Sequence, residues 1–78
     1  MSQENKLFHI CHLLFSYGIT KPEKAKTFEE LQSILKLDEN YKLKEIMEQL
    51  VEEGYVGNIN NQYFLLGKGI VAVAAIFT

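Results

Sequence analysis

The residue types that could bind a metal ion or act as a nucleophile gather in one short stretch of the chain, at His9, Cys11 and His12. Imidazole and thiolate groups are zinc ligands, and a thiolate beside an imidazole can act as a nucleophile. On a helix, His9 and His12 share one face because they are three residues apart, whereas Cys11 falls on the apolar side. We therefore interpret Cys11 as a buried thiol beside two surface imidazoles, and we expect no enzymatic activity, no metal site and no cofactor.

A second polar group lies in the middle of the chain and has the chemistry of nucleic-acid contact. Lysine can bind guanine or a phosphate, asparagine can pair with adenine, and tyrosine can donate a hydrogen bond to a phosphate. Glutamate can accept only from the amino group of cytosine, and it otherwise repels the DNA backbone. The candidate residues are Asn40, Tyr41, Lys42, Lys44 and Glu45.

Other candidate contacts lie before and after this group. Thr27 could offer its hydroxyl and a helix N-terminus to a phosphate. An uncharged polar stretch further along could touch the minor groove or the sugar phosphates; its residues are Asn58, Asn60, Asn61 and Gln62. The chain has no arginine, the residue that most often reads guanine, so all of its positive charges are lysines.

Three stretches with helical spacing of apolar residues must position these side chains. The spacing predicts helices over residues 7–17, 27–36 and 41–53. In the first of them, one apolar face is predicted from Leu7, Ile10, Cys11, Leu14 and Phe15. Thr27 and Glu30 have the pattern of a capping box, which predicts the start of the second helix. Asp38 or Asn40 can cap the third helix, and Gly54 stands where a helix commonly ends in the left-handed conformation.

The remainder of the chain predicts a hairpin and a final apolar segment. Two strand-like runs, residues 55–59 and 62–66, flank the pair Asn60 and Asn61, and asparagine tolerates the positive φ of tight hairpin turns. Gly67, Lys68 and Gly69 break the second strand. Residues 70–77 fit either a short last helix or a further strand, and their three alanines favour the helix.

This order of elements predicts a mostly helical α+β fold, a winged helix-turn-helix with three helices, a β-hairpin wing and a short C-terminal helix. The spacing Leu43, Met47, Leu50, Gly54 and the hairpin after it resemble the recognition helix and wing of small archaeal, viral and bacterial regulators of the MarR and ArsR type. The resemblance covers about residues 6–78. It implies that the third helix enters the major groove of DNA with the residues at its N-terminus.

Composition limits the chain to one domain over residues 1–78. Hydrophobic residues form 47% of it and charged residues 23%, which is typical of a folded globular protein. The longest apolar stretch is far shorter than the roughly 20 residues that span a bilayer, and the polar N-terminus lacks the pattern of a signal peptide. We therefore expect a cytoplasmic protein without a membrane partner.

Charge and apolar surface predict how the protein assembles. The net charge is −2, and residues 20–44 are barely cationic, so that a single domain should bind DNA weakly. Residues 7–17 (Leu7 to Tyr17) and 70–77 (Ile70 to Phe77) are more apolar than so small a core needs, which indicates a homodimer through these segments, unless the last segment simply completes the core. We expect a homodimeric DNA-binding transcriptional regulator; the alternative is a winged-helix module that binds protein and not DNA.

Overall fold

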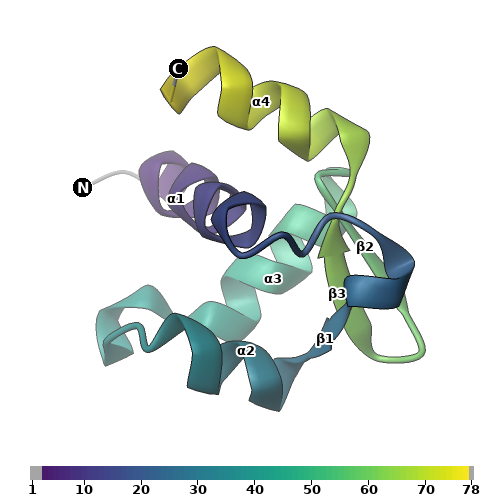
Figure 1. Cartoon of the computed structure of the whole chain (residues 1–78). Coiled ribbons are helices and arrows are strands. Elements are labelled where there is room, and N and C mark those ends of the chain that lie inside the picture. The colour runs from purple at the N-terminus through teal and green to yellow at the C-terminus, as the bar shows by residue number, and fades with distance from the viewer. Residues whose placement is uncertain (1–2, 78) are drawn as a thin grey trace.

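Helices make up most of the chain, and one small sheet joins them. The structure, a computed structural model, describes residues 3–77; residues 1, 2 and 78 of the expected domain lie outside the described residues. Between residues 3 and 77 there are four α-helices, two short 3-10 helices and a three-stranded antiparallel sheet. In chain order (Figure 1) they are α1 (Gln3–Ser16), η1 (Pro22–Lys24), β1 (Lys26–Thr27), α2 (Phe28–Leu35), η2 (Glu39–Tyr41), α3 (Leu43–Glu52), β2 (Val56–Ile59), β3 (Gln62–Leu65) and α4 (Gly67–Phe77).

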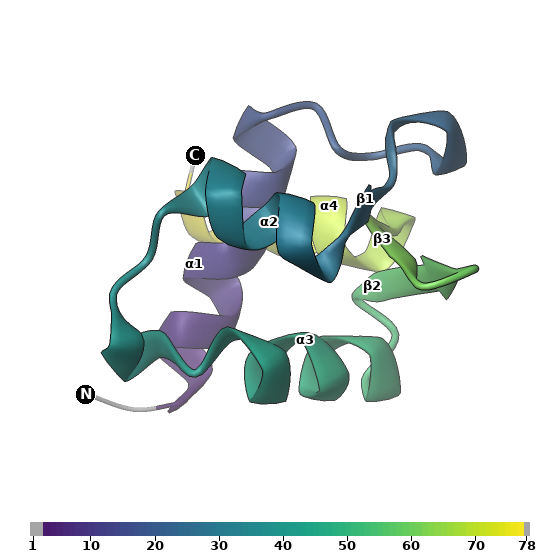
Figure 2. The same cartoon turned by 90° about the horizontal axis from the view of Figure 1, so that it is seen from below.

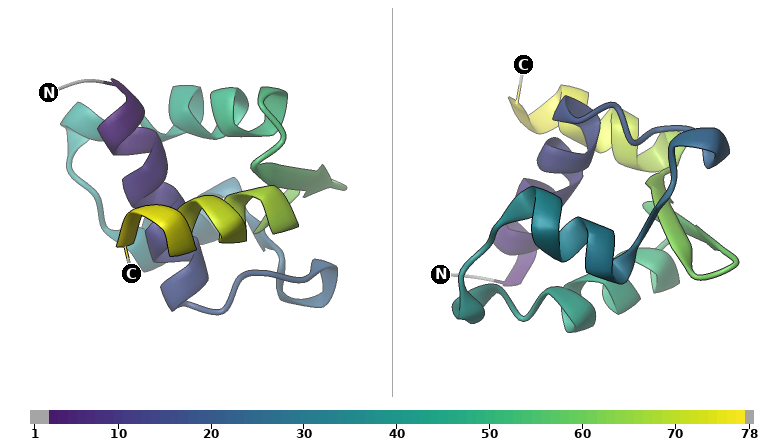
Figure 3. Two further views of the ribbon diagram at one scale, coloured as in Figure 1. Left: turned by 90° about the horizontal axis from the view of Figure 1, so that it is seen from above. Right: turned by 60° about the horizontal axis from the view of Figure 1, so that its bottom comes forward.

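The helices form layers around α1. Figure 1 shows α1 between α4 on one side and α2 and α3 on the other, and Figure 3 shows α4 crossing over α1 from above. The expected mostly helical α+β fold is confirmed, and the element order is compatible with a winged helix. Seen from below, α2, α3 and the β2–β3 hairpin share one face of the molecule (Figure 2). This face lies away from α4.

One stripe of α1 supplies much of the core. Ile10, Cys11 and Leu14 are fully buried and Leu7 is 4% exposed, as their i, i+3, i+4 spacing predicts. The same pattern also placed Phe15 in the stripe, and this is wrong because the Phe15 side chain is 48% exposed. Phe15 lies about 140° around the helix from Ile10, at the edge of the stripe, and its side chain leaves the buried side.

A capping box starts α2 as predicted. The Thr27 hydroxyl oxygen accepts a hydrogen bond from the Glu30 backbone N–H at 3.2 Å, and the Thr27 N–H donates to the Glu30 carboxylate at 2.8 Å. These two bonds satisfy N–H groups that have no partner within the first turn of the helix. The hydrogen bonds from Thr27, first from its backbone and then from its side chain, lower the pKa of the Glu30 carboxyl.

The start of α3 differs from the prediction. Residues 39–41 form the 3-10 helix η2, and α3 begins at Leu43. The Asp38 carboxylate accepts from the Asn40 N–H at 2.9 Å, so it stabilises the turn before η2 and does not cap α3. The residue at the N-cap of α3 is Lys42, in the left-handed conformation with φ 45° and without a side-chain cap. The expectation that Asp38 or Asn40 caps this helix is therefore wrong.

The sheet has the strand order β1-β3-β2, and both pairs are antiparallel. The turn residues Asn60 and Asn61 have φ 51° and φ 64°, which is the conformation that a two-residue hairpin turn requires. The hairpin prediction is confirmed. Sequence spacing did not reveal that β1 pairs with β3, through Lys26 with Tyr63 and Thr27 with Gln62.

The last segment is a helix, as its alanines favoured, but it starts at Gly67 and not at Ile70. Gly69 lies so close to the sheet that a Cβ atom there would stand 2.6 Å from the Tyr55 carbonyl oxygen. The glycine that was expected to break the strand thus lets α4 pack against it. Val73 is 5% exposed and joins the same core as the buried residues of α3, Ile46 and Met47.

Candidate nucleic-acid interface

We call the face formed by α2, α3 and the β2–β3 hairpin the lower face (Figure 2). The start of α3, with its polar residues, lies at one end of it. Asn40, Lys42, Lys44 and Glu45 are exposed, and Tyr41 is half-buried. The left-handed backbone at Lys42 separates η2 from α3. Two lysine ammonium groups thus stand in solvent around the first turn of α3. A helix N-terminus carries a partial positive charge, which adds to theirs in attracting a phosphate.

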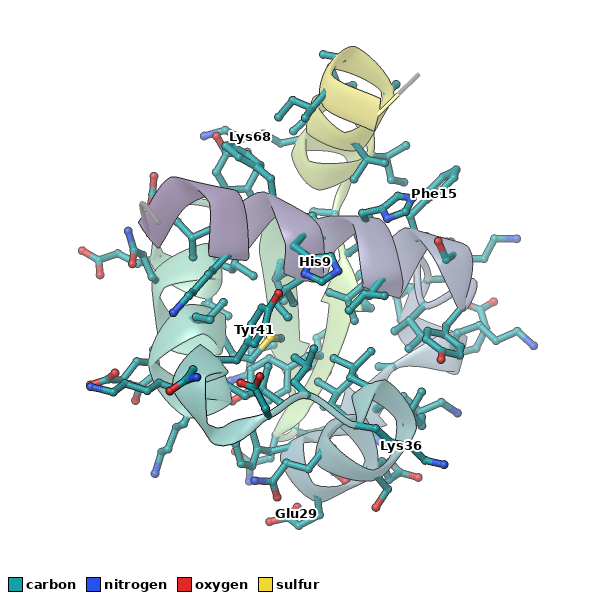
Figure 4. All side chains as sticks on the ribbon, turned by 90° about the vertical axis from the view of Figure 1, so that its left-hand side faces the viewer. His9, Phe15, Glu29, Lys36, Tyr41 and Lys68 are labelled. Carbon is teal, nitrogen blue, oxygen red and sulfur yellow. The ribbon has the colours of Figure 1, made fainter. Side chains whose placement is uncertain are left out.

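Two of these residues are also engaged inside the protein. The Tyr41 hydroxyl, expected to donate to a phosphate, is hydrogen-bonded to Nδ1 of His9 on α1. The Asn40 carbonyl oxygen accepts from Lys6 Nζ at 2.9 Å, and that ammonium lies 5.7 Å from the centroid of the Tyr41 ring. His9, interpreted from the sequence as a surface imidazole, is half-buried and contacts Tyr41. Figure 4 shows His9 and Tyr41 pointing toward each other.

Lys6 is a member of this group that sequence spacing did not reveal. It lies 34 residues before Asn40, on another helix. Lysine is common at the surface positions of helices, so nothing in the local sequence distinguishes Lys6 from the other lysines. Only the packing of α1 against the turn before α3 brings its ammonium to the interface.

The remaining predicted contacts gather at the other end of the lower face. Asn58, Asn60 and Asn61 are exposed at the hairpin, and Gln62 is half-buried. Because β1 pairs with β3, Thr27 stands opposite Gln62, and the start of α2 joins the hairpin. The predicted site is thus two groups, one toward each end of α3, a helix of ten residues that is about 15 Å long.

Between these groups the exposed side of α3 is acidic. Its carboxylates line a shallow hollow together with Gln49; they are Glu45, Glu48, Glu52 and Glu53. Gln49 Nε2 donates to the Glu53 carboxylate at 3.0 Å. These glutamates are exposed on the outer side of α3. Their charge opposes any arrangement that lays the whole length of α3 along phosphates.

The cysteine of α1 is not part of a reactive site. Cys11 is fully buried, and burial raises the pKa of its thiol to about 11. At neutral pH it is therefore a thiol and not the thiolate that attacks an electrophile or binds a metal. Among the described residues, no group of three or more histidine, cysteine, aspartate or glutamate side chains is placed to hold a metal ion.

The apolar segments expected to mediate dimerisation divide into buried and exposed parts. On α4, Val73 belongs to the chain's own core, whereas Val71 is 69% and Ile76 51% exposed. On and just after α1, Phe15 is 48% and Tyr17 55% exposed. The Phe77 side chain of the expected interface lies outside the described residues. In the part of the chain that the structure describes, no helix has the length and apolar character needed to cross a membrane.

Comparison of this chain with protein-family models, with curated proteins and with solved structures gives no match. The resemblance to winged-helix regulators therefore stays a prediction.

Proposed function

We propose that this chain is a winged-helix protein that binds double-stranded DNA with the first turn of α3 in the major groove. The observation that supports this most is the exposed pair Lys42 and Lys44 at the start of α3. Helix α3 shares one face of the molecule with α2 and the β2–β3 hairpin (Figure 2). In a helix-turn-helix, the N-terminal residues of the second helix reach the base edges. The hairpin turn would then contact the backbone or the minor groove beyond α3.

The charges along α3 specify how it meets the groove. Lys42 and Lys44 are at its N-terminal end, and Glu48, Glu52 and Glu53 are exposed toward its C-terminal end. A tilted approach, with the N-terminal end of α3 deepest in the groove, brings the lysines to the bases and phosphates and holds these glutamates off the DNA backbone. The hairpin turn can then still reach the neighbouring backbone. Glu45, at the boundary, would accept a hydrogen bond from a cytosine amino group.

A dimer compensates for the small number of phosphate contacts. Counterion release makes affinity grow with the number of phosphates neutralised, and one chain offers few exposed lysines on this face. Helices α1 and α4 carry exposed apolar side chains, and α4 lies on the far side of α1 from α2 and α3 (Figure 1). A second copy that joins at α4 would leave both α3 helices free. We propose a homodimeric transcriptional regulator that binds two half-sites.

The acidic side of α3 favours a second candidate, a winged-helix module that binds protein. Four carboxylates and Gln49 line one shallow hollow, and a basic protein segment would complement it where DNA would not. In this case the lower face is still the binding face, but its partner carries positive charge.

Titration of a fluorescent random-sequence duplex of about 20 base pairs at several salt concentrations separates the two candidates. A DNA-binding chain shows a dissociation constant that rises with salt, with a slope of log K against log salt near 0.9 per phosphate contacted. Absence of binding at low salt contradicts the proposal and favours the protein-binding module. A basic test peptide such as oligolysine should then bind wild type, and a Glu48→Gln/Glu52→Gln variant should bind it less tightly.

A further inference from the structure

Three side chains connect the N-terminal half of α1 to the turn before α3. The imidazole of His9 contacts the Tyr41 ring, with centroids 5.5 Å apart, and its Nδ1 is hydrogen-bonded to the Tyr41 hydroxyl. Lys6 lies beside the same ring and donates to the Asn40 carbonyl oxygen. These three residues, which we call the α1–η2 cluster, place an ionisable imidazole next to a tyrosine at the proposed DNA-binding end of α3.

The hydrogen-bond capacity of this pair depends on the protonation of His9. A phenol has one proton to donate, and a neutral imidazole has one N–H donor and one bare nitrogen. With the proton of the neutral ring on Nε2, Nδ1 accepts from Tyr41, so the hydroxyl proton is engaged inside the protein. In the imidazolium form, Nδ1–H donates to the Tyr41 oxygen. The hydroxyl proton is then available to an outside acceptor.

We propose that protonation of His9 makes Tyr41 a phosphate donor at the start of α3, so that DNA binding takes up a proton. This inference rests on the proposed function and adds a regulation of the same site. The proton that binds His9 comes from solvent, and no covalent bond changes. By linkage, binding that takes up a proton becomes tighter as the pH falls.

The other charged groups around His9 fit this direction. Lys6 and His12 lie within one turn of His9 on α1, and Lys42 follows Tyr41. A proton on His9 therefore adds to the positive charge of the two lysines and favours binding of an anion. The Asp38 carboxylate accepts from the Asn40 N–H. At the end of α2, Lys36 points away from His9 in Figure 4. On α4, Lys68 donates to the Glu53 carbonyl oxygen at the opposite end of α3.

The size of the effect is bounded. Histidine is the side chain whose charge changes between about pH 5 and pH 8. One proton per chain limits the slope of log K against pH to one, and we expect the DNA affinity to rise roughly five- to tenfold between about pH 8 and pH 5.5. The ordinary pKa of a carboxyl group lies below this range, so carboxylates contribute little to the pH dependence.

The experiment measures duplex affinity by fluorescence anisotropy over this pH range at constant ionic strength. Wild type is compared with His9→Gln, with Tyr41→Phe and with the matched control His12→Gln, which removes the chain's other histidine from the same helix. We expect the pH dependence to be lost in His9→Gln and in Tyr41→Phe, which keeps the ring but lacks the donor, and to persist in His12→Gln. Thermal melts of each variant verify that it is folded.

The outcomes separate this inference from the proposed function. Wild type that does not bind DNA at any pH overturns the proposed function and this inference with it. Wild type that binds with the same affinity at every pH overturns only the inference. The inference is also overturned if His9→Gln keeps the wild-type pH profile, or if His12→Gln loses it.

Discussion

The face formed by α2, α3 and the hairpin and the face formed by α1 and α4 present different chemistry to solvent. The first face carries exposed lysines, glutamates and asparagines. It also carries a large apolar side chain in the open, Ile59 at the hairpin, which is 48% exposed. The second carries Phe15, Val71 and Ile76 in the open. Both faces are built on one shared core. Binding at the first should therefore depend on salt, whereas binding at the second should depend on protein concentration.

Helix α4 shows that apolar composition does not by itself assign a face. After Lys68, its described residues carry no ionisable side chain. Yet Val73 is buried against the rest of the chain and Val71, two residues earlier, is 69% exposed. One helix thus completes the core on one side and leaves an uncovered apolar surface on the other.

The largest expected effect separates these two sides of α4. Val73→Glu puts a carboxylate into the core without a partner, and we expect it to destabilise the fold by roughly 3–5 kcal/mol or to prevent folding. Val71→Glu makes the same change at an exposed position of the same helix and should alter the stability little. Urea unfolding followed by circular dichroism measures both. Equal destabilisation by the two substitutions would show that α4 does not pack on α1 in this orientation.

The next effect concerns assembly. If α1 and α4 mediate a dimer, wild type should sediment at twice the 9.0 kDa of one chain at tens of micromolar, and Ile76→Glu should be monomeric and folded. The reason is that an unpaired carboxylate in a desolvated interface is costly. Ile59→Glu is the matched control, because Ile59 is similarly exposed on the other face. A monomeric wild type at this concentration contradicts the dimer.

A third prediction concerns the glycines at the start of α4. Gly69→Ala brings a Cβ atom within 2.6 Å of the Tyr55 carbonyl oxygen, and we expect it to cost about 1–3 kcal/mol because the helix must move away from the sheet. Gly67→Ala is the control, since no atom lies within 4 Å of a Cβ built there. The difference in melting temperature between the two variants measures the effect. No difference would mean that α4 does not approach the sheet this closely.

A smaller effect tests the lower face. Lys42→Gln/Lys44→Gln should weaken DNA binding by roughly tenfold, or about 1.4 kcal/mol, and should lower the salt slope by about one unit for each phosphate that a lysine no longer neutralises. Lys21→Gln/Lys24→Gln removes the same charge from the loop around η1, away from the first turn of α3. Anisotropy titrations at three salt concentrations compare the pairs. Equal weakening by both pairs would indicate only nonspecific attraction to positive charge.

The smallest expected effect concerns the cap of α2. Thr27→Ala removes the side-chain hydrogen bond to the Glu30 N–H and should destabilise the protein by about 0.5–2 kcal/mol. Thr20→Ala, in the loop before η1, is the matched control. Folding lowers the pKa of the Glu30 carboxyl. The hydrogen bonding of its carboxylate therefore stabilises the fold fully at pH values above the pKa that Glu30 has in the unfolded chain. This stabilisation is lost as the pH falls through the pKa that Glu30 has in the folded protein. Melts at neutral and acidic pH measure both effects.

The predictions from spacing hold where one short segment is sufficient to determine the structure. The capping box at Thr27, the hairpin turn at Asn60 and Asn61 and the left-handed Gly54, with φ 83°, all depend on residues next to one another. The prediction failed at the start of α3, where several polar residues could each have served as the cap. The order of the elements was predicted almost completely, but the fine boundaries were not.

The sequence alone determined the helices, the hairpin and the buried stripe, because periodicity and turn chemistry act over a few residues and need no distant partner. It also determined that exposed lysines surround the start of α3. Only the tertiary structure decided that Lys6 and His9 approach Tyr41, that β1 joins the hairpin, and that Val73 is buried while Val71 is exposed. The first two of these features join residues that are far apart in the chain. The third separates two valines that are equally apolar. They depend on how helices pack, which no local pattern encodes.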